Sequence, residues 1–130
     1  MAANVKDLVA AAHQVVPGIT TEDARQKMES GALLLDVREP NELEASGTAQ
    51  GAHHVPRGLL EFRADPESPL HDPALTPDRP VVLFCAAGGR AALAGKTLKD
   101  MGYTEVYNLG GFKDWQEAGG PVTARVDPGM

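Results

Sequence analysis

The chain has 130 residues, the size of one ordinary domain, and its 42% hydrophobic content is enough for one core, which excludes a disordered chain. No apolar run reaches the roughly 18–20 residues that span a bilayer. Lysine and arginine number 12 against 18 acidic residues, a net charge of −6. Because an acidic domain is not drawn to nucleic acid or to anionic membranes, we expect neither among its partners.

The cysteine content bears on the cellular compartment. Cys85 is the only cysteine, so the chain has no internal disulfide and no cysteine-based zinc site. The first residues lack the basic start and long apolar run of a signal peptide. We therefore expect a cytoplasmic protein, in which Cys85 is either a small buried side chain or a reactive nucleophile.

The first third of the chain predicts two helices and a strand. Residues 4–16 carry apolar side chains at helical spacing, and this stripe packs either on the domain or on a second copy of the chain. A second helix begins at Thr20 or Thr21, has acidic residues in its first turn and ends before Gly31. Residues 32–37 form a continuous apolar run, typical of a buried strand in a parallel sheet.

The rest of the chain continues this alternation. Residues 65–80 contain five prolines, which indicates a surface loop. The other expected elements, in order, are a short helix or turn at 41–47, strands at 53–56, 81–85 and 105–109, and helices that start near 58, 91 and 113. This order predicts an α/β fold, a single domain with a mostly parallel sheet of about five strands flanked by helices. We expect a helical extension at residues 1–17, the domain at 18–123 and a tail at 124–130.

The most informative segment follows the clearest strand. Cys85 stands where that buried strand ends and a helix is about to begin. Gly88 and Gly89 let the backbone turn tightly, so that successive N–H groups point at one spot. The helix N-terminus adds a partial positive charge and Arg90 a permanent one. All these features favour a thiolate over a thiol, so the sequence predicts a nucleophilic cysteine.

This loop and its surroundings resemble the rhodanese family of sulfurtransferases. The resemblance runs from Ile19 to Val122, and its loop is a cysteine, four residues and an arginine, followed by a small residue. Cys85, Arg90 and Ala91 fit that pattern. One position departs from it, because Thr48 stands where the family often has histidine. The matching segments, in order, are LLLDVREPNE, GTAQGAHHVPRG, VVLFCAAGGRAALAGKTLKDMGYTEVYNLGGFKDW and GGPV.

The resemblance implies transfer of a sulfane sulfur from thiosulfate or a similar anion. The thiolate of Cys85 would take the sulfur as a persulfide and pass it to a thiophilic acceptor, which is cyanide in an assay and a thiol or a protein in the cell. No metal or organic cofactor is expected. The persulfide would be held by the loop N–H groups and by Arg90, which makes the expected binding residues Ala86, Ala87, Gly88, Gly89, Arg90 and Ala91.

Two other functions stay open. Tyrosine phosphatases use a cysteine, five residues and an arginine, whereas this loop has four intervening residues. The shorter loop makes a tighter cradle, which suits a single sulfur atom better than a phosphate. The alternatives are therefore a phosphatase or arsenate reductase of related fold, and a sulfur-carrier or interaction module.

Three further residues are expected to support the site. Asp36 and Arg38 follow a buried strand and, by the resemblance, lie near the active-site face. We expect Asp36 to accept hydrogen bonds from a loop and Arg38 to form an ion pair with Glu42 or Glu44. Arg57 either reaches the mouth of the pocket or forms a surface salt bridge.

The histidines are not expected to bind a metal ion, and the aromatic residues near the end of the chain are expected in the core. His53 and His54 are adjacent, so in a strand they face opposite ways and cannot hold one metal ion together. No metal site is expected. Phe112 and Trp115 are expected to form a core pair under the last helix, and the glycine pair at 110–111 to shape the rim of the pocket.

Overall fold

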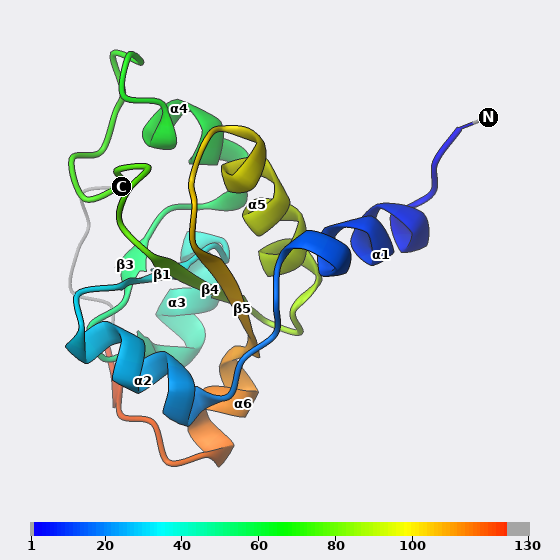
Figure 1. The fold of residues 1–130 in the computed structure, drawn as a ribbon. Helices are drawn as coiled ribbons and strands as arrows, with labels where there is room; N and C mark the ends of the chain where they lie inside the picture. Colours follow the sequence, from blue (N-terminus) through cyan, green and yellow to red (C-terminus); the bar gives the residue numbers. More distant parts are fainter. Residues whose placement is uncertain (1, 125–130) are drawn as a thin grey trace.

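The computed structural model describes residues 2–124 and has an α/β fold with a parallel sheet of four strands (Figure 1). The strand order is β3-β1-β4-β5, and every neighbouring pair is parallel. The predicted fold class is confirmed, with one strand fewer than the five or so expected. The four strands are β1 (Leu33–Asp36), β3 (His53–His54), β4 (Val81–Cys85) and β5 (Val106–Gly111).

The two central strands are buried along their whole length, which explains their continuous apolar sequence. Every residue of β1 and of β4 is buried. A parallel strand covered on both faces has no solvent side on which polar residues would alternate. The runs at 32–37 and 81–85 therefore identified the centre of the sheet correctly.

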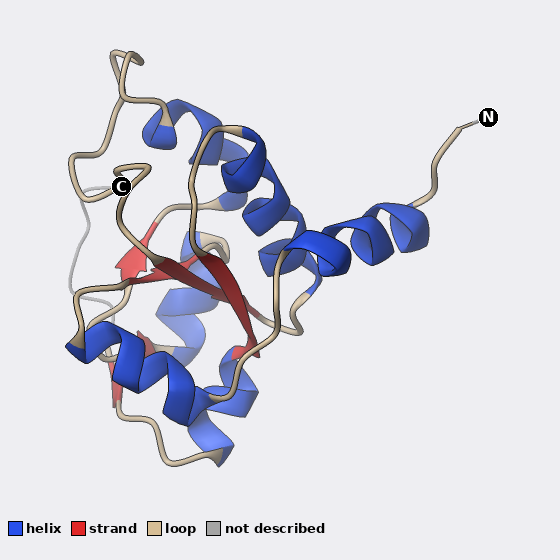
Figure 2. Cartoon of the chain, in the orientation of Figure 1, coloured by secondary structure: helices blue, strands red, loops and turns tan. Residues whose placement is uncertain are grey.

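Helices cover both faces of this sheet (Figure 2). On one face lie α4 (Leu60–Ala64) and α5 (Gly89–Asp100), with α1 (Val5–Val15) packed on α5. On the other face lie α2 (Thr21–Glu29) and α6 (Phe112–Glu117). Phe112 and Trp115 of α6 are buried in this second cluster, as predicted.

The first helix packs on the domain over part of its length only. Ala12 is buried against the domain, whereas Val5 and Leu8 are 69% and 48% exposed. Figure 1 shows the first turns of α1 extending away from the sheet. The second helix begins as predicted, because the Thr20 hydroxyl accepts the backbone N–H of Asp23 at 3.1 Å and so caps α2.

A small second sheet was not predicted. β2 (Thr48–Ala49) pairs antiparallel with β6 (Val122–Thr123), next to the short helix α3 (Pro40–Ser46). Strands of two residues are too short to show an alternating pattern in the sequence. A parallel bridge between Gly18 and Asn108 also extends the main sheet by one residue pair.

The proline-rich segment at residues 65–80 is a loop, as predicted, but it is anchored. Asp72 is 5% exposed and accepts hydrogen bonds from His53 and Arg63, and Leu75 is fully buried. The neighbouring His54 instead bonds the backbone oxygen of Arg38, so the two histidines point to different partners. Of the expected tail, residues 125–130 lie outside the described residues, and the other domain limits stay a prediction.

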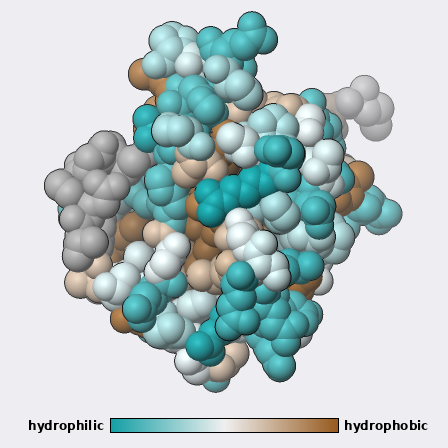
Figure 3. Space-filling model, turned by 60° about the vertical axis from the view of Figure 1, so that its left-hand side comes forward, coloured by the Kyte–Doolittle hydropathy of each residue, from teal (hydrophilic) through white to brown (hydrophobic). Residues whose placement is uncertain are grey.

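The surface carries few large apolar areas in the view of Figure 3, where hydrophilic residues predominate and hydrophobic ones show through in small separate patches. Among the described residues, no helix is both long enough and apolar enough to cross a membrane.

Gly95 of α5 is expected to tolerate no side chain. A Cβ built there would lie 2.8 Å and 2.9 Å from the methyl carbons of Val16 and 3.2 Å from that of Val106, and both valines are buried. We expect Gly95→Ala to lower the free energy of unfolding by about 1–3 kcal/mol through overpacking, although alanine favours helix. Urea unfolding measures this change. Gly58→Ala is the control, because the Cβ added there meets no atom within 4 Å. An equal loss of stability in the two variants would contradict the overpacking at Gly95.

Candidate active site

Cys85 lies at the carboxyl edge of the parallel sheet. It is the last residue of β4, and its side chain belongs to the core, with 1% of the residue exposed. Asp36 ends the neighbouring strand and pairs in register with Phe84. Cys85 and Asp36 therefore reach the same edge, as the strand order predicts, and in open parallel sheets this edge is where ligands bind.

The loop after Cys85 folds around its sulfur. Gly88 has φ 103°, a left-handed conformation that favours glycine, and α5 begins at the next residue. The backbone N–H groups of Gly88 and Ala91 donate to Sγ at 3.0 Å and 3.4 Å. Of the six loop residues singled out in the sequence, these two thus bring their N–H groups to the sulfur. They surround Sγ with partial positive charge at the N-terminus of a helix.

A second backbone segment packs against this loop. A Cβ on Gly111 would lie 2.3 Å from the carbonyl oxygen of Ala86, so only glycine fits there. Gly110 lines the groove beside the loop, which agrees with the expected role of this glycine pair at the rim. Asn108, two residues earlier, joins the two segments through its side-chain amide. Its part in the site was not predicted, although it lies in the NLGGF segment.

Arg90 points to a carboxylate. Its guanidinium donates to both oxygens of Glu42, at 2.7 Å and 3.0 Å. The hydrogen bond from Arg90 holds the pKa of Glu42 at about 2, and the same bond raises the pKa of Arg90. A thiolate at Cys85 also favours the charged arginine. The sequence suggested the cation but not its partner, which lies 48 residues away on α3.

Asp36 and Arg38 form a buried ion pair. Asp36 is fully buried and Arg38 is 3% exposed, with 2.9 Å between Arg38 Nη2 and Asp36 Oδ2. Asp36 also accepts the backbone N–H of Arg38 and the hydroxyl of Thr48, which confirms that it binds a loop. Of the two partners expected for Arg38, Glu42 binds Arg90 instead, because the turn after β1 folds Arg38 back onto Asp36. Thr48 is the residue that departs from the family pattern, and its hydroxyl donates this hydrogen bond to Asp36.

Arg57 does not reach the loop. Its guanidinium donates to Glu61 and to Thr97 Oγ1, each at 3.0 Å. Thr97 lies in the second half of α5, away from the residues that surround the sulfur. The surface salt bridge is therefore the correct interpretation of Arg57, since the short helical turn that contains it directs its side chain along α5.

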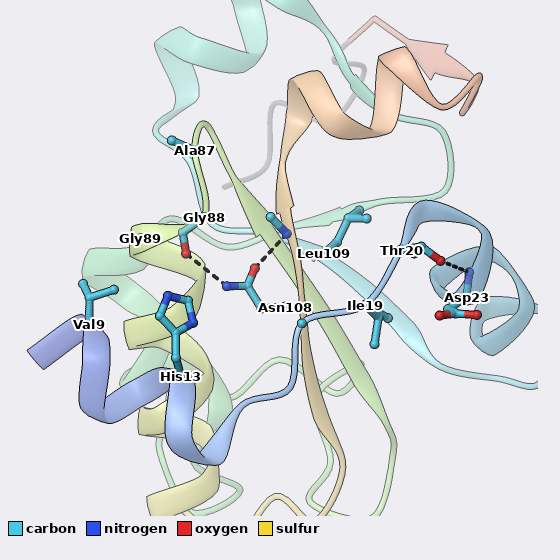
Figure 4. Close-up of a pocket in the computed structure, with 12 residues that line it drawn as sticks. Val9, His13, Ile19, Thr20, Asp23, Ala87, Gly88, Gly89, Asn108 and Leu109 are labelled. Carbon is cyan, nitrogen blue, oxygen red and sulfur yellow. Dashed lines mark hydrogen bonds between the residues drawn. The ribbon is translucent and has the colours of Figure 1, made fainter.

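A groove of about 530 Å³ lies beside the loop, on the side of α1. Figure 4 shows Val9 and His13 of α1 on one side and Thr20 and Asp23, at the start of α2, on the other. Gly88 and Asn108 lie between these walls. The loop that surrounds the sulfur thus borders an open surface of the protein.

Known proteins share this architecture. A family model described as a rhodanese-like domain matches residues 20–118. An uncharacterized protein of Bacillus subtilis is 37% identical over 113 residues, 86% of this chain and 79% of its own length. The thiosulfate sulfurtransferase GlpE of Pseudomonas aeruginosa is 32% identical over 100 residues, 75% of this chain and 82% of its own.

Two solved structures are similar over almost the whole chain. One, from Rhodopseudomonas palustris, is described as a protein of unknown function and possible tyrosine phosphatase; it is 37% identical, with a TM-score of 0.85 over 95% of this chain and 96% of that one. The other is the polysulfide-sulfur transferase homodimer of Wolinella succinogenes, also 37% identical, with a TM-score of 0.72 over 94% of this chain and 88% of that one.

The ion pair between Glu42 and Arg90 predicts a pH-dependent stability. The folded state lowers the pKa of Glu42 from its ordinary 4.5 to about 2, so the stabilisation is complete above about pH 4.5 and is lost as the pH falls toward 2. Because the Arg90 side chain is 37% exposed, we expect the ion pair to contribute only about 0.5–1 kcal/mol to the free energy of unfolding.

Glu42→Gln keeps the size of the side chain and removes its charge. We expect urea unfolding to show this variant less stable than the unmutated protein at pH 7, with the difference shrinking between pH 4.5 and pH 3. Glu117→Gln removes an exposed carboxylate from a 3.7 Å pair with Lys113 and serves as the control with little change. A difference for Glu42→Gln that stays constant over this pH range would contradict the assignment.

Proposed function

The chain belongs to the rhodanese-like domain family, and from this premise we propose that it is a sulfurtransferase that carries sulfur on Cys85. The observation that carries the proposal is the convergence of the Gly88 and Ala91 N–H groups on Sγ. Hydrogen bonds to the charged form of a thiol favour the thiolate, and the thiolate is the nucleophile.

The proposed reaction has two steps. In the first, the Cys85 thiolate attacks the outer sulfur of thiosulfate or a similar donor, the S–S bond of the donor breaks, and sulfite leaves with the bonding electron pair. In the second, an acceptor nucleophile attacks the outer sulfur of the Cys85 persulfide and restores the thiolate. With cyanide the product is thiocyanate, and the two steps together form an exchange through a covalent intermediate.

Each residue of the loop has a proposed part in this cycle. The N–H groups of the segment from Ala86 to Ala91 bind the negative charge of the thiolate and then of the persulfide. Arg90, held by Glu42, keeps a fixed positive charge at the start of α5 and contributes to attracting the anionic donor. Asp36 and Arg38 support the site without contacting the sulfur, because their buried ion pair fixes the turn at the end of β1.

The donor and acceptor follow from the same chemistry. A small sulfur-containing anion such as thiosulfate suits the positive cradle, and a thiol or a protein thiol in the cytoplasm is the proposed acceptor. The named sulfurtransferases among the similar proteins support this class of reaction. No step of the cycle requires a metal or an organic cofactor.

Phosphatase activity is the second candidate, because one similar structure is described as a possible tyrosine phosphatase. One feature of this chain favours sulfur transfer. The loop has four residues between Cys85 and Arg90, one fewer than in tyrosine phosphatases, and so forms a tighter cradle. Glu42 accepts two of the five N–H donors of Arg90, and the others remain for an anionic donor.

The proposed function predicts a persulfide that intact-protein mass spectrometry detects. After incubation with thiosulfate, the mass of the unmutated protein should rise by one sulfur atom, and cyanide should remove it with release of thiocyanate. Cys85→Ser keeps the size of the side chain but supplies no thiolate, so it should gain no sulfur and lose nearly all activity.

Hydrolysis of p-nitrophenyl phosphate, measured on the same two proteins, distinguishes the candidates. Phosphatase activity that depends on Cys85, without any gain of sulfur, would overturn the proposal in favour of a phosphatase. The absence of both activities would identify the protein as an interaction module.

A further inference from the structure

Asn108 connects the end of β5 to the loop that surrounds the sulfur. It is 5% exposed, and Figure 4 shows its side chain directed at Gly88. Its Nδ2 donates to the carbonyl oxygen of Gly88 at 3.1 Å, and its Oδ1 accepts the backbone N–H of Gly110 at 2.8 Å. One amide group thus ties together the two backbone segments that meet beside Cys85.

Gly88 is the loop residue that meets both the sulfur and Asn108. Its N–H donates to Sγ at 3.0 Å, the shorter of the two contacts, while its carbonyl oxygen accepts from Asn108 and from the backbone N–H of Ala92. Glycine at a positive φ has many alternative conformations. Two donors on its carbonyl oxygen select the one conformation in which its N–H faces the sulfur.

Asn108 is itself held firmly enough to act in this way. Its backbone N–H donates to the carbonyl oxygen of Pro17 at 2.9 Å, and its carbonyl oxygen accepts the N–H of Ile19 at 3.0 Å. It pairs with Leu83 in the sheet, immediately before the register between β4 and β5 shifts. Irregular pairing of this kind often re-aims a side chain next to a functional site.

We propose that Asn108 is a positioning residue, which fixes Gly88 so that its N–H points at the sulfur of Cys85. This role rests on the proposed function, in that it assigns a support to the same thiolate and persulfide. Asn108 does not touch the sulfur, and it acts through its bond to the carbonyl oxygen of Gly88, with Gly110 holding the other end of its amide. A side chain that merely filled space or stabilised the fold would leave the charge state of the sulfur unchanged.

The test compares Asn108→Leu and Asn108→Ala with the unmutated protein. Leucine has a similar size and no hydrogen-bonding groups, and alanine serves if leucine disturbs packing; neither introduces a charge. We measure the rate of Cys85 alkylation by iodoacetamide as a function of pH. The midpoint should move up by about one pH unit, which lowers the thiolate fraction at neutral pH by up to about tenfold.

Tyr103→Phe is the matched control. The Tyr103 hydroxyl is buried and donates to the carbonyl oxygen of Ala64 at 2.8 Å, so its loss also removes one buried hydrogen bond. Urea unfolding should show that the control and the Asn108 variants are all destabilised, but only the Asn108 variants should shift the alkylation midpoint. A midpoint that stays in place in both Asn108 variants, or that moves equally in Tyr103→Phe, would overturn the proposal.

The alkylation readout does not depend on sulfur transfer, so the two proposals fail separately. If the unmutated protein gains no sulfur from thiosulfate while the Asn108 variants still shift the midpoint, the function is wrong and the positioning role stands. If sulfur transfer occurs and the midpoint does not shift, the function stands and the positioning role is wrong.

Discussion

The convergence of two backbone N–H groups on one sulfur atom is the feature that the surrounding strands, turn and helix have to hold in place. Gly88 and Ala91 can both point at Cys85 only because β4 ends, the chain turns through a left-handed glycine, and α5 begins within five residues. The buried parallel strands hold the start of that turn, and the packing of α5 holds its end. Gly111 adds a further constraint, since it lets β5 approach the carbonyl of Ala86.

The charged side chains around this loop are arranged in pairs. Arg90 is bound by Glu42, and Arg38 is bound by Asp36, so each cation near the sheet edge has its own carboxylate. A paired arginine attracts an anion less strongly than a free one does, which leaves the uncharged N–H groups as the groups that contact the sulfur directly.

The sequence predicts features formed by neighbouring residues better than contacts between residues far apart in the chain. The strand, glycines and helix around Cys85 are contiguous, so their apolar run and turn residues predicted this strand–turn–helix geometry directly. The partners of long side chains depend on segments that only folding brings together: Arg90 and Glu42 are 48 residues apart, and neither the pair nor the turn of Arg38 onto Asp36 could be deduced from spacing. Arg57 was ambiguous for the same reason. The two-residue strands β2 and β6 were too short to leave a pattern.

The account stands on the claim that the folded loop, through its N–H groups, stabilises a negative charge on Cys85. The most direct measurement is the pH dependence of Cys85 alkylation in the unmutated protein, folded in buffer and unfolded in urea, with each rate scaled to its plateau at high pH. The unfolded chain supplies the same cysteine without the loop geometry. Our account predicts a midpoint at clearly lower pH in the folded protein. The same midpoint in both states, or a higher one in the folded state, would contradict it and would make Cys85 a packing residue.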